Sequence, residues 1–330
     1  MSTLFSYFFT KINQIPPLEH NFTEVLDSIV LKPKTLYFYG KMPENVLKND
    51  TQKSIISHKN SKKSSPKNRT NTKTKRPKTV AIVGSRHNTK YGEEIAYKLA
   101  YELGKRGAVV VSGLAFGIDS IAHRGCLDAG GVTVAVLGTA IDRIYPVTHR
   151  PLAAEIIKKG GAVMSEYAPG AKVYPKTSFL ERNRLISGLS DAVVIVEAAE
   201  RSGSLNTATH AINQGKEVFA VPGNITNPYS MGCNKLIKQG AIPYTEPKDV
   251  LELLFPEDYA KKRKKLYQAG LFGDNDVETK ILQALAEGLR SGEEIMAKTH
   301  LPPEIFNETV TLLEIKSRIR SLGANNWGLV

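Results

Sequence analysis

The chain has 330 residues, of which 41% are hydrophobic and 23% charged, and this ordinary globular composition excludes a chain that is disordered throughout. Its uncharged apolar stretches are shorter than the roughly 18 residues that span a bilayer, and its two cysteines are too few for a disulfide framework, so we expect a cytoplasmic protein without a membrane segment. The net charge of +13 comes largely from one segment, residues 51–79, which carries ten basic and no acidic side chains.

Residues 1–50 are predicted to be a lead-in that adds one strand, at 35–40 (TLYFYG), to the sheet of the following domain. Residues 51–79 are rich in Lys, Ser, Asn and Thr and nearly free of apolar residues, so we expect a disordered basic insert. Its charge could attract the phosphates of nucleic acid or could simply keep an insertion solvated. The sequence leaves both interpretations open.

Between residues 80 and 256, short β-branched runs alternate with amphipathic stretches. Continuous apolar strands separated by helices are typical of a parallel sheet that is covered on both faces. We therefore predict an α/β domain with a doubly wound, mostly parallel sheet. The predicted strands are 80–83, 108–111, 132–137, 162–164, 192–196 and 217–221, and the predicted helices are 91–105, 120–129, 152–159, 183–189 and 207–214.

The remainder of the chain has a different pattern. Residues 257–274 are predicted to be a basic linker, and residues 275–330 a small α+β domain of the winged-helix type. Its elements are expected to be helices at 277–287, from Ser291, and from Pro302 to about Ile319, followed by a hairpin at 320–330. Because the third helix carries acidic and basic side chains in balance, the sequence leaves open whether this domain binds duplex DNA or protein.

Glycines gather in three predicted loops that join a strand to the next helix. Loops that follow parallel strands open on the same edge of a sheet and can surround one ligand. Glycine allows the tight turn, and the free N–H groups at a helix start attract anions. Each glycine alone could simply make a turn, but together the loops predict an anion site that includes Ser85, Arg86, Gly113, Gly117, Ser202, Gly203 and Ser204.

Residues 176–184 combine cations with an aromatic ring at a predicted helix start: Lys176, Phe179, Arg182 and Arg184. Cations hold phosphates, and an aromatic face stacks a base with a gain of roughly 1 to 3 kcal/mol. This combination is suited to an unpaired nucleic-acid strand. The alternative is a structural helix start in which Phe179 lies in the core and the arginines pair with Glu166 or Glu181.

Signatures of catalysis are missing from the sequence. It contains no ATP-binding loop, no dinucleotide fingerprint, no G-x-S-x-G elbow and no H-E-x-x-H. Only one histidine, His123, lies near the glycine loops, and we expect a structural hydrogen bond between it and Asp119, one turn earlier. We therefore predict no catalytic residues, no metal and no cofactor, and a protein that is not an enzyme.

Eight motifs, in order along the chain, resemble the DprA/Smf family, the DNA-processing proteins of bacterial transformation. They are Gly-Ser-Arg at 84–86, Ser-Gly-Leu-Ala-Phe-Gly-Ile-Asp at 112–119, Tyr-Pro at 145–146, Ser-Glu at 165–166, Phe-x-x-Arg-Asn-Arg-x-Ile at 179–186, Ser-Gly-Ser-Leu at 202–205, Val-Phe-Ala-Val-Pro-Gly at 218–223, and Gly-x-Asn-x-Leu-Ile with Gly-Ala at 232–241.

The resemblance implies an extended Rossmann fold that binds single-stranded DNA without sequence preference, forms homodimers, protects incoming DNA and loads a RecA-type recombinase onto it. Many members add a C-terminal winged-helix domain. Carried over by motif, the DNA groove would use Arg86, Lys176, Phe179, Arg182 and Arg184, with Ser85, Gly113, Gly117, Ser202, Gly203 and Ser204 around it.

The alternative function is that of a Rossmann-like nucleotide N-glycoside hydrolase of the lysine-decarboxylase-like type. Such enzymes use a related sheet and a glutamate on the helix after a glycine-rich loop. Here residues 206–210 (NTATH) contain no carboxylate where a catalytic one is expected, which argues against this alternative.

Overall fold

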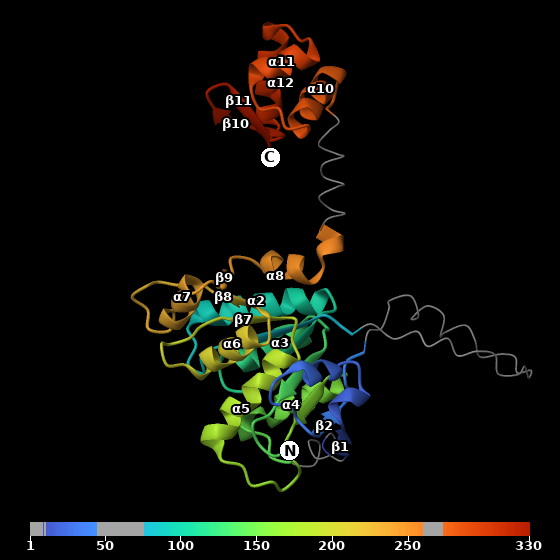
Figure 1. The fold of residues 1–330 in the computed structure, drawn as a ribbon, viewed down its shortest axis with the longest axis vertical. Helices are drawn as coiled ribbons and strands as arrows, with labels where there is room; N and C mark the ends of the chain where they lie inside the picture. Colours follow the sequence, from blue (N-terminus) through green and yellow to red (C-terminus); the bar gives the residue numbers. More distant parts are fainter. Residues whose placement is uncertain (1–8, 10, 45–75, 260–272) are drawn as a thin grey trace, which may run out of the picture. The chain divides into compact units, whose positions relative to one another are not determined.

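The computed structural model describes residues 9, 11–44, 76–259 and 273–330 (Figure 1), and the side chains of Pro175 and Lys176 also lie outside the described part. The chain divides into two compact units, Met1–Leu254 and Phe255–Val330. Most of the predicted insert and linker fall outside the described residues. The last four residues of the predicted insert do belong to the fold, because Arg76 pairs with Asp191 at 2.8 Å and Thr79 begins a strand.

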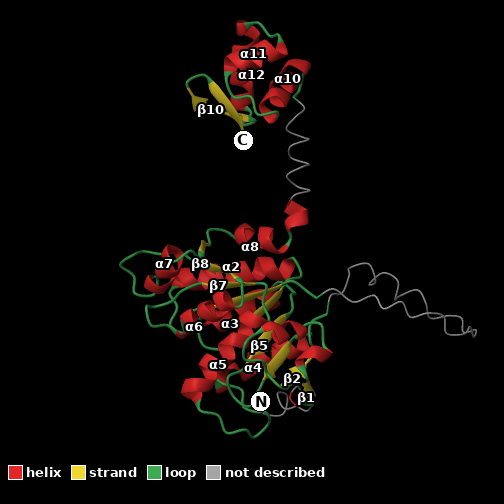
Figure 2. Ribbon diagram, in the orientation of Figure 1, coloured by secondary structure: helices red, strands yellow, loops and turns green. Residues whose placement is uncertain are grey.

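The first unit is built on a nine-stranded sheet of order β1-β2-β6-β5-β4-β3-β7-β8-β9 (Figure 2). All neighbours from β6 to β9 are parallel, whereas β1 pairs antiparallel with β2, and β2 antiparallel with β6. The predicted mostly parallel, doubly wound sheet is thereby confirmed. The strands are β1 Asn13–Ile15, β2 Leu36–Gly40, β3 Thr79–Val83, β4 Val109–Ser112, β5 Thr133–Val136, β6 Ala162–Ser165, β7 Ala192–Ile195, β8 Glu217–Ala220 and β9 Ile242–Pro243.

Helices cover both faces of this sheet. The helices α2, α3 and α4 follow β3, β4 and β5 and pack side by side, with α8 against α2, whereas α5 and α6 pack together. The change of face follows from the strand order, because the chain leaves β6 on one side of β3 and re-enters at β7 on the other. The helices are α2 Lys90–Lys105, α3 Ile118–Asp128, α4 Arg150–Lys158, α5 Pro175–Gly188, α6 Gly203–Asn213, α7 Met231–Lys238 and α8 Pro247–Leu254.

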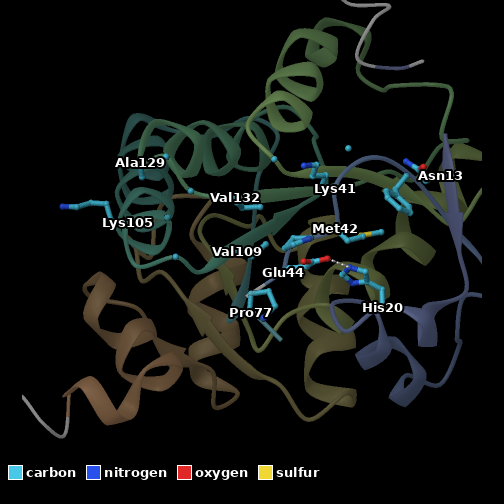
Figure 3. A pocket seen from close by; sticks show the side chains of 18 residues that line it. Asn13, His20, Lys41, Met42, Glu44, Pro77, Lys105, Val109, Ala129 and Val132 are labelled. Carbon is cyan, nitrogen blue, oxygen red and sulfur yellow. Dashed lines mark ion pairs between the residues drawn. The ribbon is translucent and has the colours of Figure 1, made fainter. Parts of the chain in front are cut away.

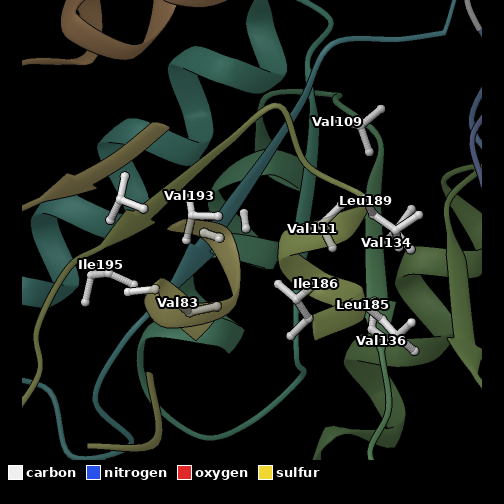
Figure 4. Close-up of a cluster of buried hydrophobic side chains, with 14 of the residues drawn as sticks. Val83, Val109, Val111, Val134, Val136, Leu185, Ile186, Leu189, Val193 and Ile195 are labelled. Carbon is white, nitrogen blue, oxygen red and sulfur yellow. The ribbon is translucent and has the colours of Figure 1, made fainter. Parts of the chain in front are cut away.

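A buried apolar layer holds α5 against the sheet (Figure 4). Successive residues of a strand point to opposite faces, so β4 directs Val109 and Val111 toward α5 and its neighbours. On the helix side the layer includes Leu185, Ile186 and Leu189. The short 3₁₀ helix η3, Glu24–Ser28, extends the same layer, so the N-terminal lead-in packs into the core as well as adding β2.

Two helices begin at least one turn earlier than predicted. Helix α5 starts at Pro175 rather than 183, because proline fits the first helical turn, where its missing N–H leaves no hydrogen bond unmade. Helix α6 starts at Gly203 rather than 207, because the Ser202 side chain caps it by accepting from the Ser204 N–H. Both extensions place predicted site residues, Lys176 in α5 and Gly203 and Ser204 in α6, in the first turn of a helix. The helices α7 and α8 were not predicted.

Between residues 273 and 330, the second unit contains three helices, α10 Asp276–Ala286, α11 Gly292–Thr299 and α12 Pro303–Ile315, and a hairpin of β10 Ile319–Gly323 and β11 Asn326–Leu329. Its own core includes Ile281, Leu285, Ile295, Phe306 and Leu313. These are the predicted elements, except that α12 ends at Ile315 rather than near 319. That the unit is a winged-helix domain stays a prediction. Within the described residues of both units, no helix has the length and apolar character needed to cross a bilayer.

Candidate nucleic-acid interface

Three loops meet around one cavity at the carboxyl edge of the parallel strands. They follow β3, β4 and β7, the strands at which the order of the sheet reverses. At such a point the loops diverge to opposite faces and leave a crevice, which is where open α/β sheets bind their ligands. The cavity has a volume of about 500 Å³ and is lined by all three loops and by α5. The three glycine loops that the sequence placed at one edge of the sheet thus lie next to one another in the fold.

Gly117 allows the first two loops to touch. Its φ is +76°, and a Cβ there would lie 2.3 Å from the carbonyl oxygen of Ser85. Next to it, the N–H of Ile118 donates to that same carbonyl at 3.1 Å. A side chain at 117 would therefore push the β3 loop, which carries Arg86, away from the β4 loop.

Arg86 and Phe179 form the exposed part of the site. Arg86 is exposed and its Cζ lies 5.6 Å from the centroid of the Phe179 ring, within the range of a cation–π contact. The half-buried Phe179 ring rests on Gly138, where a Cβ would come within 2.7 Å of it, and lies 5.6 Å from the ring of Tyr145. Phe179 therefore packs against the fold and also presents part of its ring beside a free cation.

Arg182, predicted to contact DNA, belongs to the wall of the cavity but is almost fully buried. Its Nη1 donates to the Gly113 carbonyl at 2.9 Å and to the Val136 carbonyl, and its side chain is 4% exposed. Burial lowers its pKa to about 10, while the Asp119 carboxylate opposes this shift and Arg86 adds to it. Arg182 therefore stays charged at neutral pH, and its guanidinium supports the β4 loop from below.

Asp119 is the carboxylate partner of this buried cation. Its Oδ2 accepts from the N–H groups of Gly113 and Ala115, at 3.1 and 3.4 Å. Burial raises the pKa of Asp119, and the charge of Arg182 and these N–H groups act in the opposite direction. Together, Arg182 and Asp119 fix the loop between β4 and α3 from two sides.

Arg184, the other predicted contact, lies away from the cavity. Its guanidinium pairs with the Glu166 carboxylate at 2.6 and 2.8 Å, and its Nε donates to the carbonyl of Leu31 at 2.8 Å. This is the pairing with Glu166 that the sequence left open as the alternative. The side chain ties α5 to the end of β6 and to the N-terminal lead-in, and it does not line the cavity.

The loop before α6 supplies the predicted hydroxyls and also a cation, Arg201, that was not predicted. The Oγ atoms of Ser202 and Ser204 lie 2.7 Å apart at the start of α6, and Gly203 lines the cavity with them. Arg201 lines the cavity too and is exposed. The sequence could have indicated Arg201 as a site residue, because it lies in the third glycine loop. Asn183 donates to the Gly203 carbonyl at 3.2 Å and so joins α5 to α6.

The expected hydrogen bond between Asp119 and His123 is not formed. Asp119 turns back to its own loop, whereas His123 Nδ1 lies 2.7 Å from the Thr133 hydroxyl on β5. His123 Nε2 is buried and has no hydrogen-bond partner among the described residues. Burial lowers the pKa of His123 to about 3, with the charges of His149 and Arg182 adding to the effect. His123 is therefore a neutral core residue.

A second cavity, of about 970 Å³, lies at the opposite, amino edge of the sheet (Figure 3). Its lining includes Val109 and Val132, at the amino ends of β4 and β5, together with Lys105 and Ala129 at the carboxyl ends of α2 and α3. Carbonyl groups at helix carboxyl ends repel anions. The carboxyl-edge cavity, beside the start of α6, is therefore the better candidate for phosphates. Over the described residues no cluster of three metal-ligating side chains occurs.

Comparison with known proteins gives one consistent result. The family described as DNA recombination-mediator protein A matches residues 68–255. Protein Smf of Escherichia coli is 49% identical over 179 residues, which is 53% of this chain and 46% of that protein. The chain thus spans about half the length of this curated relative, and no more than 61% of the length of the others that match well.

Two solved structures are similar over most of the chain. The structure of DNA processing protein A from Streptococcus pneumoniae has a TM-score of 0.58 at 35% identity, with coverage of 74% of this chain and 75% of that one. The second structure is that of DNA processing protein A from Helicobacter pylori and concerns its single-stranded DNA binding mode. It has a TM-score of 0.57 at 29% identity, with coverage of 75% of this chain and 97% of that one.

Proposed function

Because the chain belongs to the DNA recombination-mediator protein A family, we propose that its carboxyl-edge cavity binds an unpaired DNA strand and holds it without cleaving it. One observation carries this proposal: the exposed Arg86 guanidinium lies over the ring of Phe179 at the mouth of the cavity. A cation beside an aromatic face suits a phosphate and its base, which is how single strands are held without sequence preference.

The proposed roles follow from exposure. Arg86 and Arg201 are exposed and hold phosphates, Phe179 stacks a base, and the start of α6 with Ser202, Gly203 and Ser204 offers N–H and hydroxyl donors. Ser85, Gly113 and Gly117 shape the loops around them. Arg182 and Arg184 act as positioning residues, because other protein groups occupy both guanidinium groups. Lys176 stays a predicted phosphate contact, since its side chain lies outside the described part.

The lining of the cavity favours binding over hydrolysis. Among its described residues the only carboxylate is Asp119, which accepts hydrogen bonds from two backbone N–H groups beside Arg182. The nearby Glu197 is 1% exposed and accepts from the N–H and hydroxyl of Thr89, at 2.9 and 2.6 Å. Neither carboxylate is free to act as a general acid or base, so we retain the prediction that the protein is not an enzyme.

We extend the proposal to the biological role. The protein would act in the cytoplasm as a homodimer that shields incoming single-stranded DNA and loads a RecA-type recombinase onto it during transformation. The family description as a recombination mediator and the single-stranded DNA binding of the Helicobacter pylori relative support this role. Light scattering would test the dimer, and recombinase filament assembly on DNA that is already coated would test loading.

The DNA-binding proposal is tested by fluorescence anisotropy with a labelled oligothymidine and the same length of duplex, in a salt titration. Arg86→Ala should lower the slope of log affinity against log salt by about one, and Phe179→Ala should weaken binding by at least about fivefold. Lys98→Ala, which removes an exposed cation on α2 outside the cavity, is the matched control.

Parent protein that binds duplex as tightly as the single strand would refute the function. Variants at Arg86 and Phe179 that both bind within twofold of the parent would refute the site. The labelled strand should also be recovered intact after long incubation, since a shortened product would revive an enzymatic role.

A further inference from the structure

We infer that the segment from Arg143 to Arg150, at the end of the connection between β5 and α4, carries a second stacking platform over which the DNA strand continues after it leaves the cavity. The platform is the ring of Tyr145. The inference rests on the proposed function and specifies the side of the cavity on which the strand continues, toward β5 and β6 rather than toward β8.

Tyr145 is exposed but not isolated. Half of its surface (50%) is open to solvent, and its ring centroid lies 5.6 Å from that of Phe179 with the two planes tilted by 50°. The exposed half of Tyr145 thus lies next to the half-buried ring of Phe179. A base packed on Phe179 therefore has a second ring beside it, on which a neighbouring base of the same strand can pack.

A second aromatic pair lies at the other end of the segment, formed by the exposed Phe116 and the half-buried His149. The ring of Phe116, which is 47% exposed, meets the ring of His149 edge-on at 4.9 Å. His149 Nδ1 also lies 2.8 Å from the Leu114 carbonyl, so this pair joins the loop to the β4 loop of the cavity. Two aromatic pairs thus connect this segment to elements that line the cavity, Tyr145 to α5 and His149 with Phe116 to the β4 loop.

The charge of the loop suits a phosphate backbone. Arg143 and Arg150, which flank the rings in sequence, are both exposed, and neither forms an ion pair within the described part of the chain. The neighbouring acid, Asp142, accepts from the N–H of Gly170 at 2.9 Å. Free cations that alternate with exposed rings are typical of surfaces that bind single strands.

The loop is held in place before any ligand arrives. The Thr139 hydroxyl donates to the Arg143 carbonyl at 2.6 Å, and the Ser165 hydroxyl donates to the Thr139 carbonyl at 2.6 Å. Ile144 is buried, 6% exposed, so the residues on either side of it in the chain, Arg143 and Tyr145, turn outward. A preformed surface of this kind loses little conformational entropy on binding.

The test compares oligothymidines of about 4 and about 16 nucleotides, which bracket the site sizes of single-strand grooves. With the full chain, Tyr145→Ala should weaken binding of the longer strand by at least about fivefold and leave the shorter one within twofold of the parent. Tyr145→Phe, which keeps the ring, should bind like the parent. Tyr97→Ala, which removes a partly exposed ring on α2, is the matched control.

The outcomes separate the inference from the proposed function. Unchanged affinity of Tyr145→Ala for both lengths would overturn the platform while leaving the cavity proposal intact. An equal loss for both lengths would overturn it too, because Tyr145 would then act only by supporting Phe179. A parent protein that binds neither strand would overturn the proposed function and the platform with it.

Discussion

Replacing Arg182 by methionine should destabilise the first unit by about 2 to 5 kcal/mol, because two buried carbonyl groups would lose a hydrogen-bond donor and the buried Asp119 a nearby positive charge. The substitution keeps most of the side-chain volume and removes the charge and the donors. The carbonyls of Gly113 and Val136 then lose their donor, at about 1 to 3 kcal/mol for each buried group that stays unsatisfied. Asp119 would remain buried without the neighbouring cation.

The assay can separate the two units. The chain has one tryptophan, Trp327, which lies on β11 in the second unit, so its fluorescence reports only on that unit. Far-UV circular dichroism during urea unfolding reports mainly on the larger first unit. Arg182→Met should shift the dichroism midpoint to lower urea and leave the tryptophan midpoint unchanged.

A double-mutant cycle with Asp119→Asn identifies the cause. Because the amide carries no charge, the second substitution should recover part of the loss, with a coupling of at least about 1 kcal/mol between the two positions. A loss under about 1 kcal/mol, or strictly additive effects, would contradict the reasoning. Should Arg182→Met keep full stability and yet lose DNA affinity, Arg182 would be a direct DNA contact, as the sequence first predicted.

Three further outcomes are expected. Arg184→Met should cost about 2 to 4 kcal/mol, because it strands the Glu166 carboxylate, which is only 15% exposed, yet DNA affinity should stay within twofold in anisotropy titrations. Gly117→Ala should lower the free energy of unfolding by at least about 2 kcal/mol and weaken DNA binding, since its Cβ would overlap a backbone carbonyl. The control is Gly130→Ala, where φ is a similar +72° but the space around the residue is open. It should lower stability by only about 1 kcal/mol and leave DNA binding intact. The depressed pKa of His123, about 3 in the fold against 6.5 ordinarily, means that the unfolded chain takes up the proton first. Stability should be full above about pH 7.5 and fall by about 2 kcal/mol between that pH and about pH 5, a loss that His123→Gln should reduce in urea midpoints at the two pH values.

The fold could be predicted because its strands are continuous apolar runs. The sequence does not specify the order of the parallel strands in the sheet. It does show that helices join successive strands, and parallel strands joined in this way place all their glycine loops at one edge. The short α7 and α8 escaped prediction, because each has only eight residues and follows loops rich in turn-forming residues.

The two arginines of α5 were misplaced for an identifiable reason. With the helix start set at 183, Arg182 and Arg184 both belonged to a helix terminus, where they could face one ligand. The helix in fact begins at Pro175, and residues two apart in a helix point about 200° away from each other. If the helix start had been predicted at Pro175, the side chains of Arg182 and Arg184 would have been expected on opposite sides of the helix, with Phe179 on the side of Arg182. The Glu166 partner of Arg184 depends on tertiary packing and was open until the fold was known.

The two ends of the basic insert have a practical consequence. Glu44, the last described residue before residues 45–75, and Pro77, two residues after them, both line the amino-edge cavity, whereas the proposed DNA cavity opens at the carboxyl edge of the same sheet. A biotin or a dye attached within residues 45–75 would be joined through Glu44 and Pro77 to the edge of the sheet opposite the proposed DNA cavity. The association and dissociation of a DNA strand could then be recorded on single molecules without any change to the residues of the proposed binding site.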